Sequence, residues 1–233
     1  MELKAQHIGL YWSQVYDRYP KCEQQVAIAG IAEALDEIFP LPRFWFSKDG
    51  EPTLLQCQRD AFLFNWRRQR PSDEYPHYDA VKKCFFEELD SYQAFLAARV
   101  GRQIDVVRNC ELTYVNIIHR NDFWSTHSQI GEVLPALDRI ASVQDEEWLF
   151  TGTHVVLQYR AAENIAVNAD IKTAKLKSGE ALVFLLELKA RGAPPRLSIH
   201  ETQGWYEGAH DAIQNLFLRL TRQELQKLVW QPK

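Results

Sequence analysis

The sequence predicts an α+β protein in which antiparallel sheet packs against long amphipathic helices. Three observations support this class: apolar residues recur at helical spacing in several long segments, other segments alternate apolar and polar residues, and strands and helices do not alternate regularly. The order of elements hints at two related halves. We expect an N-terminal α+β half over residues 1–120 and a C-terminal β-meander with a helix over 121–233, with one continuous domain as the alternative.

Two helices are expected before the first strand. Aromatic and aliphatic residues spaced three and four apart predict a helix over 5–19, which Pro20 ends. A second helical stretch is predicted over 24–39, where the following prolines stop it. The period then changes to that of a short strand at 44–47, and a Lys-Asp-Gly turn follows it.

A hairpin is predicted over residues 53–67, with Arg59 and Asp60 as its loop. Pairing across this loop places three residue pairs on one face: Cys57 with Phe62, Leu55 with Phe64, and Thr53 with Trp66. The opposite face then carries polar side chains, namely Gln56, Gln58, Asn65 and Arg67. We expect that face to be wet, as in a sheet with one solvated side.

The middle of the chain predicts a long helix and a strand. An apolar stripe that includes Cys84 predicts a helix over 77–99, and Gly101 marks its end. Residues 104–119 return to strand character, and 121–147 are irregular with a short helix near 134–140.

The last third predicts three strands followed by a helix. The strands cover 148–160, 164–173 and 181–189, and the short loops between them indicate an antiparallel meander. A helix is expected over 205–220, and Thr-Arg-Gln-Glu at 221–224 resembles a capping box that opens a last short helix.

The composition excludes several classes of protein. The net charge of −4 supplies no overall basic excess for a nucleic-acid backbone, which argues against that partner and leaves a local basic patch as the alternative. The longest apolar run is far shorter than a membrane span needs, and the N-terminus lacks the apolar core of a secretion signal. The cysteines form no C-x-x-C pair, and we expect Cys57, Cys84 and Cys110 to be buried free thiols. These features favour a cytoplasmic protein without a metal site or cofactor.

Several blocks of sequence resemble a sporadically distributed prokaryotic family of about this length that has no established activity. The blocks are His7–Trp12 with Tyr19-Pro20, Leu55–Arg68 with Tyr75-Pro76, Glu111–Ile118, and Ala209-His210 with Phe217 and Trp230. The resemblance implies no catalytic residue. It also implies an apolar strand ahead of the first block, and this sequence shows no such strand. We therefore expect an unpaired sheet edge that could pair with a second copy of the chain in a homodimer.

The densest polar and aromatic cluster lies around the predicted hairpin. Its candidate binding residues are Gln58, Arg59, Asn65, Trp66 and Arg67. Arginine grips carboxylates and phosphates and stacks on rings, so the cluster could bind a small anionic or planar ligand or a protein partner. An ordinary solvated sheet face is the competing interpretation.

No catalytic motif is present. The chain has no nucleophile elbow and no phosphate-binding glycine loop. We therefore expect a non-enzymatic binding or protein-interaction module of a prokaryotic cytoplasmic system. The alternative is an enzyme of unknown class, such as a hydrolase that uses His119 or His127 with a carboxylate such as Asp122.

Overall fold

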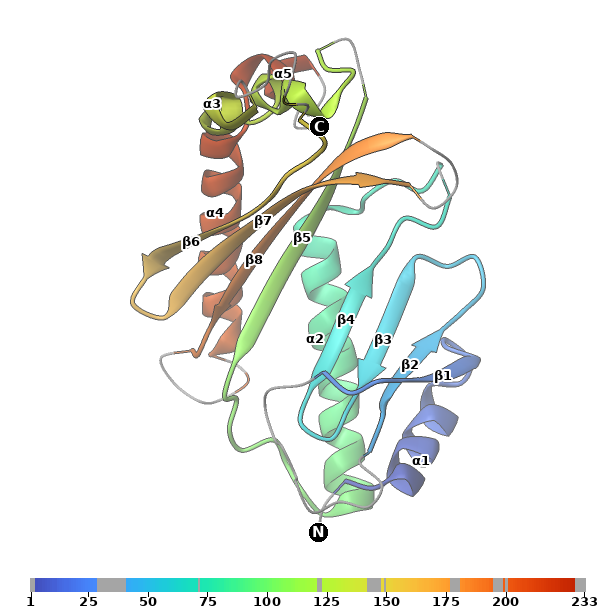
Figure 1. Cartoon of the computed structure of the whole chain (residues 1–233). Helices are drawn as coiled ribbons and strands as arrows, with labels where there is room; N and C mark the ends of the chain where they lie inside the picture. The colour runs from blue at the N-terminus through green and yellow to red at the C-terminus, as the bar shows by residue number, and fades with distance from the viewer. Residues whose placement is uncertain are drawn as a thin grey trace. The chain divides into compact units, whose positions relative to one another are not determined.

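The fold is described from a computed structural model of the chain, and it contains two compact units, Met1–Ile104 and Asp105–Lys233. The structure describes residues 3–28, 41–70, 72–120, 123–141, 148, 150–176, 181–194, 199 and 201–228. Each unit holds one four-stranded antiparallel sheet and its own helices (Figure 1), which confirms the predicted α+β class.

The N-terminal unit begins with a helix and continues as an antiparallel meander. Helix α1 (Ala5–Val15) precedes strands β1 (Lys21–Gln25), β2 (Arg43–Ser47), β3 (Thr53–Cys57) and β4 (Phe62–Trp66). The strands lie in the order β1-β2-β3-β4. Helix α2 (His77–Phe95) follows, extends through the π-helical turn η1 (Leu96–Val100), and ends at Gly101, whose φ of 68° suits glycine.

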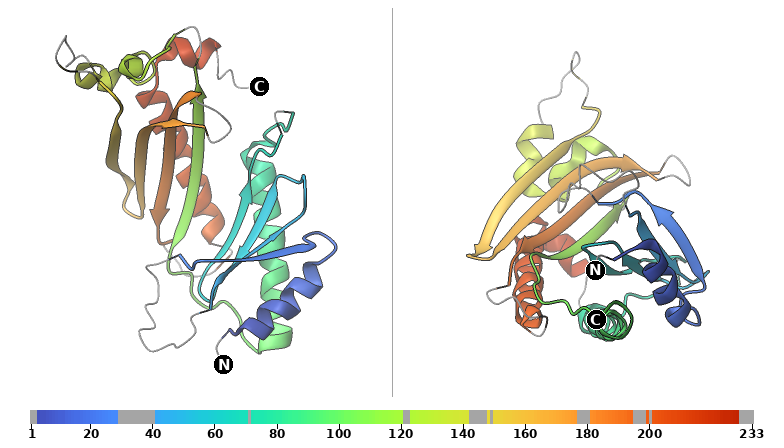
Figure 2. Two further views of the ribbon diagram at one scale, coloured as in Figure 1. Left: turned by 45° about the vertical axis from the view of Figure 1, so that its right-hand side comes forward. Right: turned by 90° about the horizontal axis from the view of Figure 1, so that it is seen from below.

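The predicted hairpin register is confirmed residue by residue. Thr53 pairs with Trp66, Leu55 with Phe64 and Cys57 with Phe62. Leu55, Cys57, Phe62 and Phe64 pack in a core that α1 and α2 complete with Tyr11 and Tyr92 among others. Two views in Figure 2 show α2 running along one face of this sheet.

The predicted helix over 24–39 is wrong at its start. Gln24 and Gln25 belong to β1 and pair with Phe44 and Arg43 of β2. Residues 26–28 have no regular structure, and 29–40 lie outside the described residues. Pairing with a neighbouring strand thus decides the conformation of a polar segment whose sequence has no strand alternation.

The C-terminal unit contains a four-stranded sheet in which the last strand along the chain pairs with the first. Its strands are β5 (Cys110–His119), β6 (His154–Ala162), β7 (Ile165–Lys175) and β8 (Leu182–Gly192), in the order β5-β8-β7-β6. The predicted meander β6-β7-β8 is present, and β5 begins at residue 110 rather than at 104. We expected this strand in the N-terminal half, but ten residue pairs join it to β8 in the C-terminal unit.

Short helices connect β5 to β6, and two helices follow β8. The connection holds η2 (His127–Glu132), η3 (Pro135–Leu137) and α3 (Asp138–Ala141), close to the short helix predicted there. Helix α4 (Thr202–Leu220) packs on β5, β7 and β8, and α5 (Gln223–Leu228) follows it. The hydroxyl of Thr221 donates to the carbonyl of Phe217 in α4, so Thr221 closes that helix and the predicted capping-box role is not seen.

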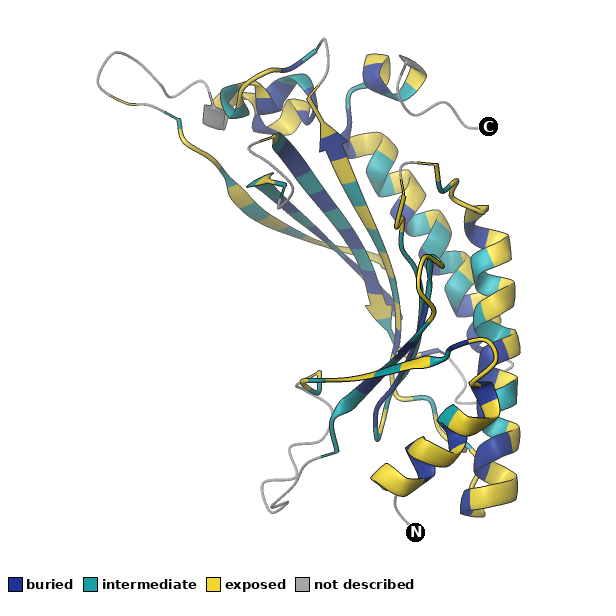
Figure 3. Ribbon diagram, turned by 90° about the vertical axis from the view of Figure 1, so that its right-hand side faces the viewer, coloured by how far each residue is buried: buried dark blue, intermediate teal, exposed yellow. Residues whose placement is uncertain are grey.

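The core of the C-terminal unit follows the predicted alternation. Phe184, Leu186 and Leu188 of β8 are buried and the residues between them are half-buried, although Val183 ahead of Phe184 is buried as well. Figure 3 shows the same alternation of buried and exposed residues along the strands. Trp124 reaches this core from the connection after β5, and its ring centre lies 4.3 Å from that of Phe184.

Candidate functional site

The candidate site lies on the face of the N-terminal sheet opposite the core. Strand alternation sends Phe44, Phe46 and Leu55 toward α1 and α2. The residues between them point to the other face, where the register places Trp45 of β2 directly opposite Gln56 of β3. This face also carries Arg43, Asn65 and Arg67, together with two leucines, the buried Leu54 and the half-buried Leu63.

Two arginines meet on one indole ring. The guanidinium carbon of Arg43 lies 5.5 Å from the ring centre of Trp45, and that of Arg67 lies 5.4 Å from it. Both distances are within the range of a cation–π contact. Arg43 comes from the same strand as Trp45, whereas Arg67 reaches the ring from the end of β4, so the sheet register brings both guanidinium groups to the same ring.

Buried polar atoms of this cluster lack partners among the described residues. The Nε atoms of Arg43 and Arg67, the Nε1 of Trp45 and the Oε1 of Gln56 are closed to solvent and form no hydrogen bond. Neither arginine forms an ion pair with a residue in the described part of the chain, although Glu23 lies across from Trp45 on β1. A buried polar atom without a partner costs about 1–3 kcal/mol, so the cluster has unused hydrogen-bonding capacity.

An amide pair borders the two arginines. The Nε2 of Gln56 donates to the Oδ1 of Asn65 across the hairpin. Gln56 is 6% exposed, so the expectation of a wet face is wrong at this residue. The Oε1 of Gln56 remains an acceptor without a partner among the described residues, on the residue that faces Trp45 across the strands. The only polar group of the Trp45 side chain is its indole N–H, which is a donor.

The side chain of Gln58 is engaged in hydrogen bonds within its own unit. Its Oε1 accepts from the backbone N–H of Ile28 at 2.9 Å, and its Nε2 donates to Asp60 at 2.8 Å and to the carbonyl of Ile28 at 3.4 Å. The side chain is 5% exposed, which again corrects the expected wet face. Gln58 therefore holds the segment after β1 against the hairpin loop.

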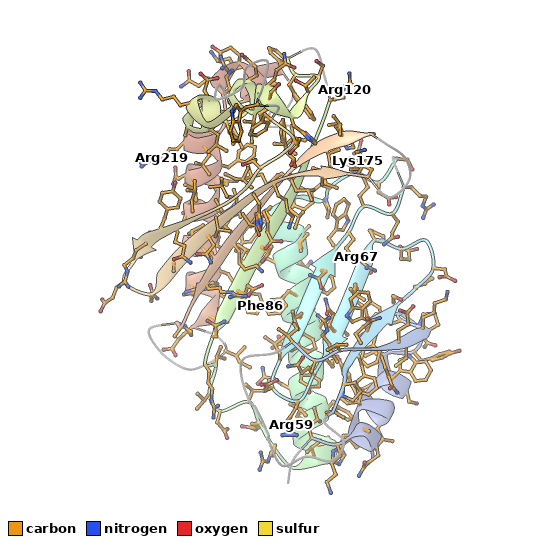
Figure 4. The ribbon with its side chains drawn as sticks, in the orientation of Figure 1. Arg59, Arg67, Phe86, Arg120, Lys175 and Arg219 are labelled. Carbon is orange, nitrogen blue, oxygen red and sulfur yellow. The ribbon has the colours of Figure 1, made fainter. Side chains whose placement is uncertain are left out.

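The remaining predicted residues do not converge. Figure 4 shows Arg59 and Arg67 at opposite ends of the β3–β4 hairpin. The chain rises roughly 20 Å over the six residues from Phe62 to Arg67. Trp66 lies on the core-side face, where its ring meets Tyr75 edge-on at 5.4 Å. Asn65 and Arg67 are thus the two predicted residues that share the arginine and tryptophan cluster.

Sequence reasoning missed Arg43 and Trp45. In β2, Arg43 and Trp45 alternate with two buried phenylalanines. This alternation could have predicted that Arg43 and Trp45 point to the same face of the sheet. The Lys-Asp-Gly turn was a local signal that β2 pairs with β3, but the turn alone does not give the register that places Trp45 opposite Gln56. Without that register, the approach of Arg43 and Arg67 to the same ring cannot be inferred.

The histidines of the alternative hydrolase do not meet. His119 is exposed at the end of β5, while the neighbouring Ile118 faces the core. The ring of His127 lies 5.6 Å from that of Phe184 on the core side, where burial lowers its pKa. Strand alternation therefore places the two histidines on opposite faces of the sheet, and Asp122 lies outside the described residues.

His210 has a partner within its own unit. Its Nδ1 lies 2.9 Å from the hydroxyl of Tyr114, which ties α4 to β5. In the part of the chain that the structure describes, no three His, Cys, Asp or Glu side chains gather so as to hold a metal ion. Nor does any helix within those residues combine the length and apolar character needed to cross a bilayer.

Comparison of the chain with protein-family models, with curated proteins and with solved structures found no match. The site must therefore be interpreted from its own geometry.

Proposed function

We propose that this protein is a binding module whose N-terminal sheet holds the anionic group of a small ligand between Arg43 and Arg67. The observation that carries the proposal is the pair of guanidinium groups on Trp45, whose Nε atoms are buried without partners among the described residues. The ligand class is a carboxylate or a phosphate, because both match the planar donor fork of arginine.

Electrostatics favours an anion at this position. Two positive charges that share one ring repel each other, and neither is neutralised by a carboxylate within the described residues. An anion between them would accept hydrogen bonds from both arginines and remove the repulsion. Such charge-assisted bonds contribute about 1.5–3 kcal/mol each.

The neighbouring groups would add selectivity for the rest of the ligand. The exposed part of the Trp45 ring can stack on a planar group, and the Oε1 of Gln56 can accept one hydrogen bond from it. The amide of Gln56 is already oriented by Asn65, so little side-chain entropy would be lost on binding.

The proposal can be tested with inorganic phosphate and with citrate as probes, at constant ionic strength. The indole N–H resonance of Trp45, assigned with Trp45→Phe, should shift in a saturable way as the probe is added. Arg67→Gln should weaken binding by about tenfold or more, which corresponds to about 1.4 kcal/mol. Arg99→Gln is the matched control, because Arg99 is exposed in the same unit and the charge change is identical.

Two outcomes would contradict the proposal. The first is a Trp45 resonance that does not respond to either probe in the folded protein. The second is an Arg67→Gln variant that binds as tightly as the Arg99→Gln control. Circular dichroism spectra of both variants would show that the fold is kept.

A further inference from the structure

Strand β4 is the last strand of its sheet, and no strand pairs with its far edge within the described residues of its own unit. Within β1–β4 it pairs with β3 alone. The bonds from Gln58 N–H to the Ala61 carbonyl and from Arg67 N–H to the Pro52 carbonyl fix which groups face β3. Backbone groups alternate sides along an antiparallel strand, so those of Phe62, Phe64 and Trp66 point away from β3.

This edge lacks the usual protection against pairing with another chain. Edge strands normally carry charged residues, prolines or bulges. Strand β1 carries Lys21 and Glu23, β5 carries Glu111, and β6 carries Arg160 beside a register shift. Strand β4 has the sequence Phe-Leu-Phe-Asn-Trp and none of these features.

In the C-terminal unit, the strand equivalent to β4 has a neighbouring strand on both sides. There, β6, β7 and β8 form an antiparallel meander followed by the long helix α4, as β2, β3 and β4 are followed by α2. Strand β8 is nevertheless internal, because β5 runs antiparallel to its far edge. The equivalent position beside β4 holds no strand among the described residues.

We propose that β4 of a second copy of this chain occupies this edge, in an antiparallel pair centred on Phe64. In this register Phe64 faces the partner's Phe64, and Phe62 faces the partner's Trp66. All these residues have outward-pointing backbone groups, so each pair would exchange two hydrogen bonds. The aromatic pairs would also lie on one face of the joined sheet, where cross-strand contacts stabilise it.

Charges at the strand ends favour the same register. Asp60 would face Arg68 of the partner subunit, and the two-fold symmetry would repeat this ion pair at the other end. Asp60 and Arg68 are both exposed. A shift by one residue would reverse the faces of the incoming strand, and a shift by two would separate these charges. The interface uses the backbone edge of β4 and does not rest on the proposed anion site.

The self-association can be tested by sedimentation at concentrations from roughly 10 μM to 1 mM. Because the strand is short, the dimer should be weak and depend on concentration. Asp60→Arg or Arg68→Asp alone should weaken it by about tenfold or more, since each places like charges opposite each other twice. The double variant with both changes should restore association.

Amide hydrogen exchange gives an independent measurement. The amides of Phe62, Phe64 and Trp66 should exchange more slowly as the protein concentration rises, while those of Leu63 and Asn65 are protected at every concentration by β3. A chain that stays monomeric over the whole range would overturn the proposal. So would a folded double variant that fails to regain association, or exchange at Phe64 that is independent of concentration.

Discussion

Glu88 of α2 holds the guanidinium of Arg18 through both carboxylate oxygens. Arg18 Nε lies 3.0 Å from Oε1 and Nη2 lies 2.8 Å from Oε2, and the hydroxyl of Tyr19 donates to the same Oε1 at 3.1 Å. Glu88 is 8% exposed, so this carboxylate joins the turn after α1 to α2 from inside the N-terminal unit.

Replacing Glu88 with Gln should therefore lower the free energy of unfolding by about 1–3 kcal/mol, because hydrogen bonds to a charged group are lost in a partly buried site. Urea denaturation would measure the change. Glu87→Gln is the matched control, because Glu87 is exposed and its Oε1 lies 3.9 Å from the Nζ of Lys83. The control substitution should change the free energy of unfolding by less than about 1 kcal/mol. Equal losses for the two variants would show that the buried contact stabilises nothing.

Phe184 should be highly sensitive to truncation, because it lies at the centre of the C-terminal core. It is fully buried and packs on Trp124 at 4.3 Å. Phe184→Ala should cost about 3–5 kcal/mol, because the cavity cannot be filled by the rigid sheet around it. Val115→Ala on the exposed face of β5 should change stability by about 0.5 kcal/mol or less in the same thermal or chemical unfolding measurement.

His127 should make stability depend on pH. Burial lowers the pKa of His127 in the folded protein, and a backbone hydrogen bond at Thr151 opposes this only in part. The unfolded chain thus takes up the proton more readily. The contribution of His127 is complete above the ordinary histidine pKa of about 6.5 and falls as the pH drops through that value toward the lower folded pKa.

His127→Gln should consequently lose less stability than the natural chain between about pH 7.5 and about pH 5.5. Urea unfolding at both pH values measures the difference. A variant whose stability falls as steeply as that of the natural chain would show that another group controls this pH range.

The four cysteines should differ in reactivity. Cys84 is exposed on α2, contrary to the expectation of a buried thiol, whereas Cys57 and Cys110 are buried as expected. Burial raises the pKa of Cys110 to about 11 and raises that of Cys57 as well. Because the thiolate is the reactive form, alkylation of the native protein should label Cys84 first and the two buried thiols only after unfolding. Mass spectrometry of the labelled peptides would reveal any early modification of Cys57.

Local patterns were sufficient to predict the β3–β4 hairpin, because side-chain alternation and a two-residue loop leave one register that keeps Leu55 and Phe64 together. They were insufficient for β1, whose polar residues take their conformation from β2. The same limit explains the candidate site. Asn65 and Arg67 could be inferred from the hairpin alone, while placing Arg43 and Trp45 beside them also requires the register that β2 takes across the turn at Gly50.

The position of β5 has a consequence for synthesis of the chain. This strand is the first of its unit to be made, yet its partner β8 is the last strand to be made, after the connecting helices and the β6–β7 hairpin. At a synthesis rate of roughly 5–20 residues per second, β5 must wait several seconds on the ribosome before its partner emerges. During that interval Ile118, which the finished fold buries, is available to chaperones or to neighbouring nascent chains, and we expect pairing of β5 with β8 to be a late step in the folding of this unit.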